Sequence, residues 1–293
     1  MLGWLIERMT NVSPNNPIWR LELRQYHGQI QQLRWRAGRI LPIIALICFL
    51  VAIVDSSTGF RTNGVTYLGF SLSFIISMLV MLPADFVYVQ AALSSLNQYR
   101  PYGDWDLVAL TEVQPIQILD GKFATALVRA WRGLMFEWVP RVVTAVMLIS
   151  FYVIGSLLDL RSSEIGTFLG WVMLLSVMAI GYLAEPFWRM RTVTAFGMAL
   201  SVVRLDPTQR VVLGACCVIA MRIVQIALFL GFAYTFAITD RFLQAYFGVL
   251  SFTRMILLSA FVGAMWCVVY FGYHILQHIA LRFAERRIFQ AEA

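Results

Sequence analysis

The sequence predicts an all-α, polytopic membrane protein with six transmembrane helices and an N-terminal amphipathic interfacial helix. Of its 293 residues, 60% are hydrophobic and only 13% are charged, and the mean hydropathy is +0.73. Ordinary soluble domains contain about 45–50% apolar and about 25% charged residues. The composition therefore excludes a soluble globular protein.

Six apolar runs set the number of predicted spans. A helix needs roughly 20 apolar residues to cross about 30 Å of hydrocarbon. We expect spans at about 40–54, 64–81 with a continuation past Asp85, 142–158, 166–184, 211–238 and 255–279. These runs predict one membrane domain over 40–281, with a tail at 1–39 and another at 282–293. The connections are too short for a soluble catalytic module.

The distribution of basic residues predicts the orientation. The two tails, the link after the second span and the link after the fourth together hold 18 of the 23 lysines and arginines, whereas the other three loops hold four. Cytoplasmic segments of membrane proteins carry such an excess. Both termini are therefore expected in the cytoplasm. The net charge of +7 follows from this distribution and suits anionic lipid headgroups rather than nucleic acid.

The N-terminal tail contains an amphipathic pattern. Apolar residues recur at spacings of three and four, opposite a basic and polar face, and this spacing is typical of a helix. The apolar face comprises Trp19, Leu23, Tyr26, Ile30 and Leu33. A basic helix with aromatic residues suits the headgroup layer of the inner leaflet. Packing on a partner subunit is the alternative.

Residues 102–122, YGDWDLVALTEVQPIQILDGK, form a compact polar island between two apolar runs. Asp104 can cap a short helix, and Pro115 suits the first turn of a second helix that continues to about Arg132. The bend between them is expected to project into the cytoplasm.

Familiar catalytic and cofactor-binding patterns are missing. Gly121 and Lys122 do not make a phosphate-binding loop, because Ile116 and Phe123 occupy positions that need glycine and a hydroxyl residue. His274 and His278 share a helix face but lack a recognisable third metal ligand. All four cysteines fall in predicted spans, which argues against a disulfide framework. We expect no cofactor, no metal and no enzymatic activity in this chain.

Three ionisable residues lie within predicted spans: Asp85, Glu185 and Arg222. Charges in hydrocarbon are costly, so each is a candidate for function by default. The alternative is that Arg222 pairs with one of the acids and fixes helix packing. Pro83 stands beside Asp85 as Pro186 stands beside Glu185, which suggests internal symmetry between the second and fourth spans.

The polar island resembles the cytoplasmic segment of type-2 ATP-binding-cassette (ABC) permeases, with its G-T-W-E-L-L-L-L-T-P-L pattern and I-x-x-G-K ending. The matching residues are Gly103, Trp105, Asp106, Leu107, Leu110, Thr111, Ile118, Gly121 and Lys122. Upstream, Asn16, Pro17, Glu22, Leu23 and Arg24 resemble the N-P-x-x-x-x-E-L-R opening of some bacterial members. Residues 199–204, ALSVVR, resemble the turn after the family's fourth span. The sequence departs from the pattern at Asp104, Glu112 and Val113.

The resemblance implies a permease subunit in the bacterial inner membrane, with export as the expected direction. Its coupling segment, 96–132, would dock on a separate cytoplasmic ATPase, and a second permease copy or a different chain would complete the transporter. Asp104, Trp105, Asp106, Val108, Leu110 and Glu112 are the expected ATPase contacts. Trp105 could instead anchor the segment to lipid. Two other functions remain open: a non-transporting membrane anchor or accessory subunit, and an ion-coupled carrier.

Overall fold

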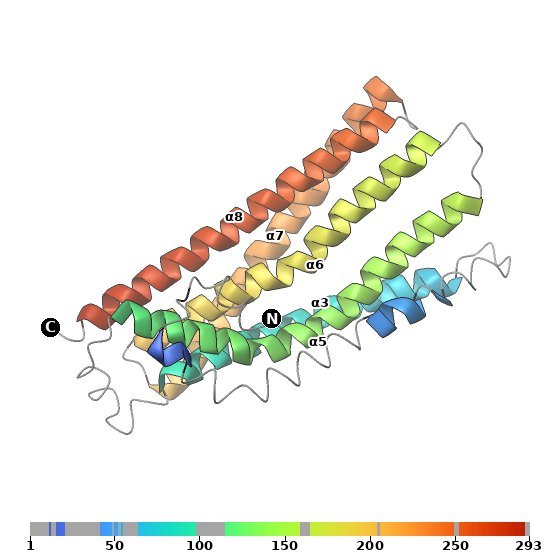
Figure 1. The fold of residues 1–293 in the computed structure, drawn as a ribbon. Helices are drawn as coiled ribbons and strands as arrows, with labels where there is room; N and C mark the ends of the chain where they lie inside the picture. Colours follow the sequence, from blue (N-terminus) through green and yellow to red (C-terminus); the bar gives the residue numbers. More distant parts are fainter. Residues whose placement is uncertain are drawn as a thin grey trace.

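The computed structural model describes residues 12, 16–20, 42–48, 50, 51, 54, 64–97, 115–158, 165–203, 206–248 and 252–290. Five long helices make up most of this part of the chain: α3 (Gly64–Asn97), α5 (Pro115–Leu158), α6 (Ile165–Val202), α7 (Pro207–Phe247) and α8 (Phe252–Gln290) (Figure 1). No strand occurs among the described residues. All five helices are long and apolar enough to cross a membrane. The prediction of an all-α, multi-pass membrane protein is confirmed.

The first predicted span, 40–54, lies outside the five long helices. Of residues 40–54, only 42–48, 50, 51 and 54 are described, and all of these are helical. The other five spans match α3, α5, α6, α7 and α8, each of which is longer than its apolar run. The N-terminal tail is described at residue 12 and at 16–20, where 17–20 are helical.

Helix α5 differs most from the sequence prediction. The predicted cytoplasmic helix and the predicted third span form one helix of 44 residues. At 1.5 Å per residue it extends about 66 Å, well beyond the roughly 30 Å of a hydrocarbon core. Pro140 lies inside it, and Figure 1 shows a bend between its two halves. Proline bends a helix because it removes a backbone hydrogen bond and crowds the preceding turn.

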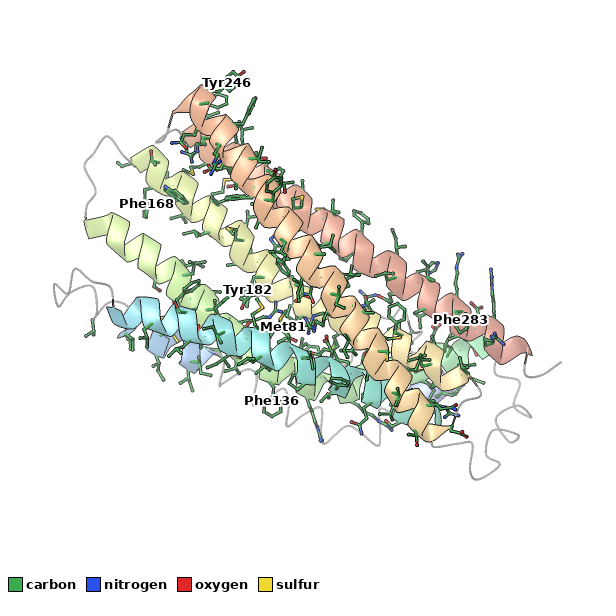
Figure 2. All side chains as sticks on the ribbon, turned by 180° about the vertical axis from the view of Figure 1, so that it is seen from behind. Met81, Phe136, Phe168, Tyr182, Tyr246 and Phe283 are labelled. Carbon is green, nitrogen blue, oxygen red and sulfur yellow. The ribbon has the colours of Figure 1, made fainter. Side chains whose placement is uncertain are left out.

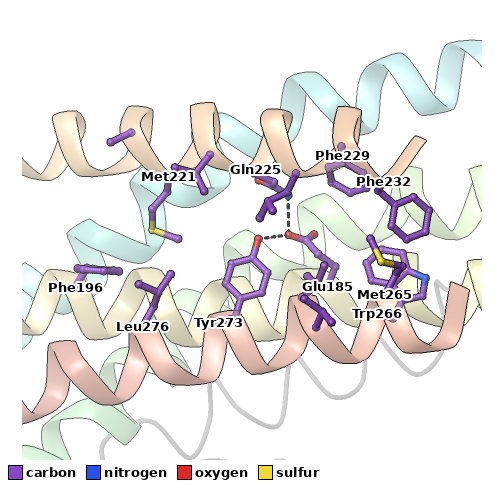
Figure 3. A pocket seen from close by; sticks show the side chains of 16 residues that line it. Glu185, Phe196, Met221, Gln225, Phe229, Phe232, Met265, Trp266, Tyr273 and Leu276 are labelled. Carbon is purple, nitrogen blue, oxygen red and sulfur yellow. Dashed lines mark hydrogen bonds between the residues drawn. The ribbon is translucent and has the colours of Figure 1, made fainter. Parts of the chain in front are cut away.

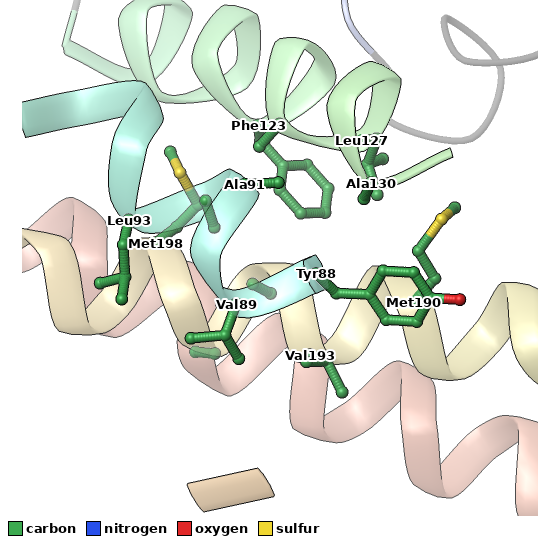
Figure 4. Packing of buried hydrophobic residues seen from close by; sticks show 14 of the residues in the cluster. Tyr88, Val89, Ala91, Leu93, Phe123, Leu127, Ala130, Met190, Val193 and Met198 are labelled. Atoms are coloured by element: carbon green, nitrogen blue, oxygen red, sulfur yellow. The ribbon is translucent and has the colours of Figure 1, made fainter. Parts of the chain in front are cut away.

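The larger apolar core lies near the start of α5. Here α3 runs between α5 and α6, and Tyr88, Phe123, Leu127 and Met198 meet across the three helices (Figure 4). Ala284 of α8 joins the same core. A smaller core towards the other end comprises Leu174, Leu243, Met255, Leu258 and Val262, from α6, α7 and α8.

The outer surface of the helices is apolar. Phe136 and Tyr246 point away from the bundle (Figure 2) and are 75% and 72% exposed. Helix α7 shows this most clearly, because most of its large aliphatic side chains are exposed and its contacts with α3, α6 and α8 are sparse. Such a surface is stable in lipid, whereas in water an extended apolar patch would drive association. Helix α7 is therefore the least firmly packed of the five.

At Gly197, α6 approaches α3 closely. A Cβ atom at this position would lie 2.7 Å from the Cβ of Ala92 and 2.9 Å from the carbonyl oxygen of Val89. Gly231 of α7, in contrast, has nothing within 4 Å of the equivalent point. The two glycines offer a matched comparison of packing.

We expect Gly197→Ala to destabilise the fold by about 1–3 kcal/mol, because the added methyl group overpacks the α3–α6 contact. Gly231→Ala serves as the control, since alanine favours a helix over glycine by about 1 kcal/mol at both positions. Thermal unfolding of the purified variants would show a lower Tm for Gly197→Ala and no decrease for Gly231→Ala. Equal Tm values would contradict the close approach.

Candidate functional site

Six charged side chains form a cluster between the two apolar cores. Helix α3 contributes Asp85, α5 contributes Glu137 and Arg141, α6 contributes Glu185 and Arg189, and α7 contributes Arg222. Arg222 is 11% exposed, and the other five side chains are at most 1% exposed. These six residues are called the charge cluster below.

Arg189 is the centre of the charge cluster. Its Nε atom donates to Glu185 Oε1 at 2.8 Å, one turn earlier on the same helix. Its Nη1 atom donates to Asp85 Oδ1 of α3, and its Nη2 atom donates to Glu137 Oε1 of α5. A guanidinium group presents five N–H donors in a fixed plane, so one arginine can hold several carboxylates at once. Arg189 thereby fastens α3, α5 and α6 together.

Arg141 makes the second set of contacts. Its Nη2 atom lies 2.7 Å from Glu137 Oε1 and 2.7 Å from Glu185 Oε2. Its Nη1 atom donates to the carbonyl oxygen of Tyr182 at 2.6 Å. Pro186 stands four residues after Tyr182 and has no N–H, so this carbonyl has lost its usual helical donor. Arg141 satisfies it, as hydrocarbon requires of every backbone polar group.

The charge cluster also holds α7 and α8. Arg222 Nη2 lies 2.6 Å from Asp85 Oδ2, and Arg222 Nη1 donates to Gln225 Oε1 at 2.6 Å. Gln225 Nε2 and the Tyr273 hydroxyl both donate to Glu185 Oε1, each at 2.9 Å (Figure 3). Five helices are thus joined at one level of the bundle.

The charges of the cluster balance, with three carboxylates opposite three guanidinium groups. Burying a charge without a partner is far more costly than burying a paired one. A movement of any one helix must therefore exchange these contacts for others or leave a charge unpaired. The arrangement suits a joint that holds the helices in discrete positions, and it offers no acid free of a basic partner.

Sequence reasoning identified half of the charge cluster. The structure places Asp85, Glu185 and Arg222 together and pairs Arg222 with Asp85. Glu137, Arg141 and Arg189 were missed, and the two arginines were counted with the cytoplasmic links. Without them the basic count of those segments falls from 18 to 16.

A signal for the missed residues exists in the sequence. Glu137 and Arg141 are four residues apart around Pro140, as Glu185 and Arg189 are around Pro186. Acid and arginine at this spacing share a helix face. The repeated combination with proline extends the parallel that links Asp85 and Pro83 with Glu185 and Pro186.

Most of the other predicted site residues lie outside the described part of the chain. These are Asp104, Trp105, Asp106, Val108, Leu110 and Glu112 of the coupling segment, and Leu23, Tyr26, Ile30 and Leu33 of the interfacial helix. Trp19 is described, and only 2% of it is exposed. Protein atoms therefore cover this tryptophan.

The N-terminal motif contacts the start of α5. Asn16 caps its own helix, since its Oδ1 atom accepts from the backbone N–H groups of Ile18 at 3.0 Å and Trp19 at 3.2 Å. Its Nδ2 atom donates to the carbonyl oxygen of Gln117 at 2.6 Å. A Cβ atom on Gly121 would lie 3.1 Å from Ile18 Cγ2. Glycine thus admits the N-terminal segment close to α5.

The described histidines and cysteines form neither a metal site nor a disulfide. No three His, Cys, Asp or Glu side chains among them form a group that could hold a metal ion. His274 stacks on Tyr270 instead. The four cysteines are free thiols.

Comparisons of this chain with family models, curated proteins and solved structures give no match.

We expect Arg189→Leu to destabilise the protein by about 3–5 kcal/mol, because it leaves three buried carboxylates short of a partner. Arg222→Leu should cost less, since Arg222 is more exposed and pairs with one carboxylate. Arg282→Leu, at an exposed position of α8, is the control. Tm and folded yield in detergent should rank Arg189→Leu lowest, then Arg222→Leu, then the control. An Arg189→Leu protein that melts with the control would show that the cluster does not hold the bundle.

Proposed function

We propose that this chain is the membrane-spanning permease subunit of an ATP-driven ABC transporter, with export as the direction of transport. ATP hydrolysis takes place on a separate cytoplasmic ATPase, and a second permease subunit completes the assembly. The proposal places the chain in a bacterial inner membrane with both termini in the cytoplasm.

The observation that carries this proposal is the contact between the two motifs that resemble the permease family. Asn16 belongs to the N-terminal motif, and its side chain reaches Gln117, which is 101 residues away and immediately precedes the I-x-x-G-K ending of the second motif. Gly121 of that ending lies against Ile18. The two segments that resemble the family therefore pack together, although they are far apart in the sequence.

Helix α5 provides a continuous mechanical path from this contact to the charge cluster. Glu137 and Arg141 lie 16 and 20 residues after Gly121 on the same helix. This separation corresponds to about 24–30 Å along the helix axis. A push on the coupling segment would displace the start of α5 and thereby act on ion pairs with α3 and α6. Coupling of this kind links nucleotide on the ATPase to the arrangement of the spans.

An ion-coupled carrier is the second candidate, and the intramembrane acids Asp85, Glu137 and Glu185 favour it. Each of them is paired with arginine, so proton binding would first have to break an ion pair. Uptake or efflux in liposomes driven by a proton gradient without ATP would support the carrier. Finding no ATPase subunit and no transport would instead favour an anchor or accessory role.

Copurification tests the permease proposal. From native membranes, the tagged chain should retain an ABC-type ATPase identified by mass spectrometry, with vanadate-sensitive ATP hydrolysis. Trp105→Ala should reduce the ratio of ATPase to permease by about tenfold or more, since buried tryptophans are frequent energetic centres of interfaces. Phe136→Ala, at an exposed position in the described part of α5, should leave the ratio unchanged. Wild-type retention of the ATPase by a well-folded Trp105→Ala protein would refute the docking role of this residue.

A further inference from the structure

A cavity of about 460 Å³ lies between α7 and α8, with α6 at its base (Figure 3). Small-molecule sites typically have volumes of roughly 300–1,000 Å³. It lies at the same level as the charge cluster, since Glu185, Gln225 and Tyr273 form part of its wall. The rest of the wall is apolar, and aromatic and methionine side chains such as Phe229, Trp266 and Met221 are prominent in it.

The cavity opens towards the outside of the bundle. Leu228 of α7 and Val268 of α8 both line it and are 57% and 64% exposed. These residues lie near the middle of their helices, where the surroundings of a membrane protein are lipid tails. A ligand would therefore enter sideways from the bilayer, and such a ligand must dissolve in hydrocarbon.

The polar residues of the wall decide the charge of the ligand. Glu185 already accepts hydrogen bonds from Arg189, Gln225 and Tyr273, and its second oxygen accepts one from Arg141. A cation in the cavity would find this carboxylate fully engaged. Because an unpaired charge in an apolar site is strongly unfavourable, the cavity suits an uncharged ligand.

We propose that this cavity is a binding site for an uncharged, lipophilic small molecule taken from the bilayer. Such molecules would be the substrate class of the proposed permease. Calling the ligand a substrate rests on the proposed function, whereas the binding site itself does not. The occupant would contact Gln225 and Tyr273, the two side chains that fasten α7 and α8 to Glu185. Occupation of the cavity would thus act on the charge cluster from the side of the least firmly packed helix.

Substitution of two glycines gives a variant in which the cavity is filled and a control in which it is not. A Cβ atom at Gly272 would have nothing within 4 Å, and Gly272 lines the cavity. Gly272→Phe therefore adds a ring at the cavity wall, with no clash at its Cβ atom. Gly231 has equally open surroundings on α7 but is not part of the cavity wall. Gly231→Phe is its matched control.

The experiment is photolabelling of the full-length chain in liposomes with trifluoromethyl-(iodophenyl)diazirine, an uncharged probe that partitions into bilayers. Peptide mass spectrometry should show saturable labelling near Met221 and Tyr273, with non-saturable labelling at lipid-facing positions such as Leu230, which is 67% exposed. Gly272→Phe should reduce the saturable part about tenfold, because it occupies the space that the ligand needs. Gly231→Phe should leave it unchanged.

An isosteric pair of competitors tests the charge preference. Excess tert-butylbenzene should abolish the saturable labelling, whereas phenyltrimethylammonium, of the same shape but cationic, should not. Stronger competition by the cation would overturn the assignment of an uncharged ligand. Labelling that rises in proportion to probe concentration, or that falls equally in both glycine variants, would overturn the site.

The source of the ligand is tested on the same preparation. Native mass spectrometry should show no phospholipid held in fixed ratio by the wild-type chain. A phospholipid that is retained, and is lost only in Gly272→Phe, would overturn the proposal in favour of a lipid acyl chain. The labelling uses the chain without an ATPase, so its failure would leave the copurification result, and with it the permease proposal, unaffected.

Discussion

The arrangement of the bundle depends on Arg189 and the three carboxylates around it. Asp85, Glu137 and Glu185 come from three different helices and all bind this one guanidinium group. In hydrocarbon little water is available to compensate a displaced charge, so separating the partners of these ion pairs is strongly unfavourable. The two apolar cores lie on either side and exclude solvent from the cluster.

Backbone chemistry is part of the same constraint. Pro186 deprives the Tyr182 carbonyl of its helical donor, and Arg141 replaces that donor. The nearby Leu183 carbonyl accepts from Trp138 Nε1 at 3.1 Å. A proline within a span is tolerated when neighbouring side chains take up the freed groups. Here the replacement donor comes from α5, so the turn of α6 that carries Pro186 adds specificity to the α5–α6 contact.

Helix α5 is continuous between the N-terminal contact and the charge cluster. One helix runs from the contact with Asn16 at Gln117 to the charge cluster at Glu137 and Arg141. Helix α7 is attached differently: Asp240 pairs with Arg254 of α8 towards the far end, and Arg222 and Gln225 link α7 to the charge cluster. The cavity lies beside those links. A firmly packed helix and a loosely packed helix therefore meet at one polar joint, and packed interfaces of this kind favour discrete arrangements over continuous deformation.

The sequence by itself determined the membrane class and the positions of five of the spans, because the demand of hydrocarbon for about 20 apolar residues is local and can be read from one segment. It also indicated Asp85, Glu185 and Arg222, since any charge in an apolar run stands out. Glu137, Arg141 and Arg189 were not predicted because each lies at the edge of an apolar run, where a charged residue is ordinarily assigned to a loop and a basic one to a cytoplasmic loop. Only the tertiary structure decided that α5 is a single bent helix and that Arg189 meets three acids. Those pairings depend on how distant helices pack, and no single segment of the chain records that geometry.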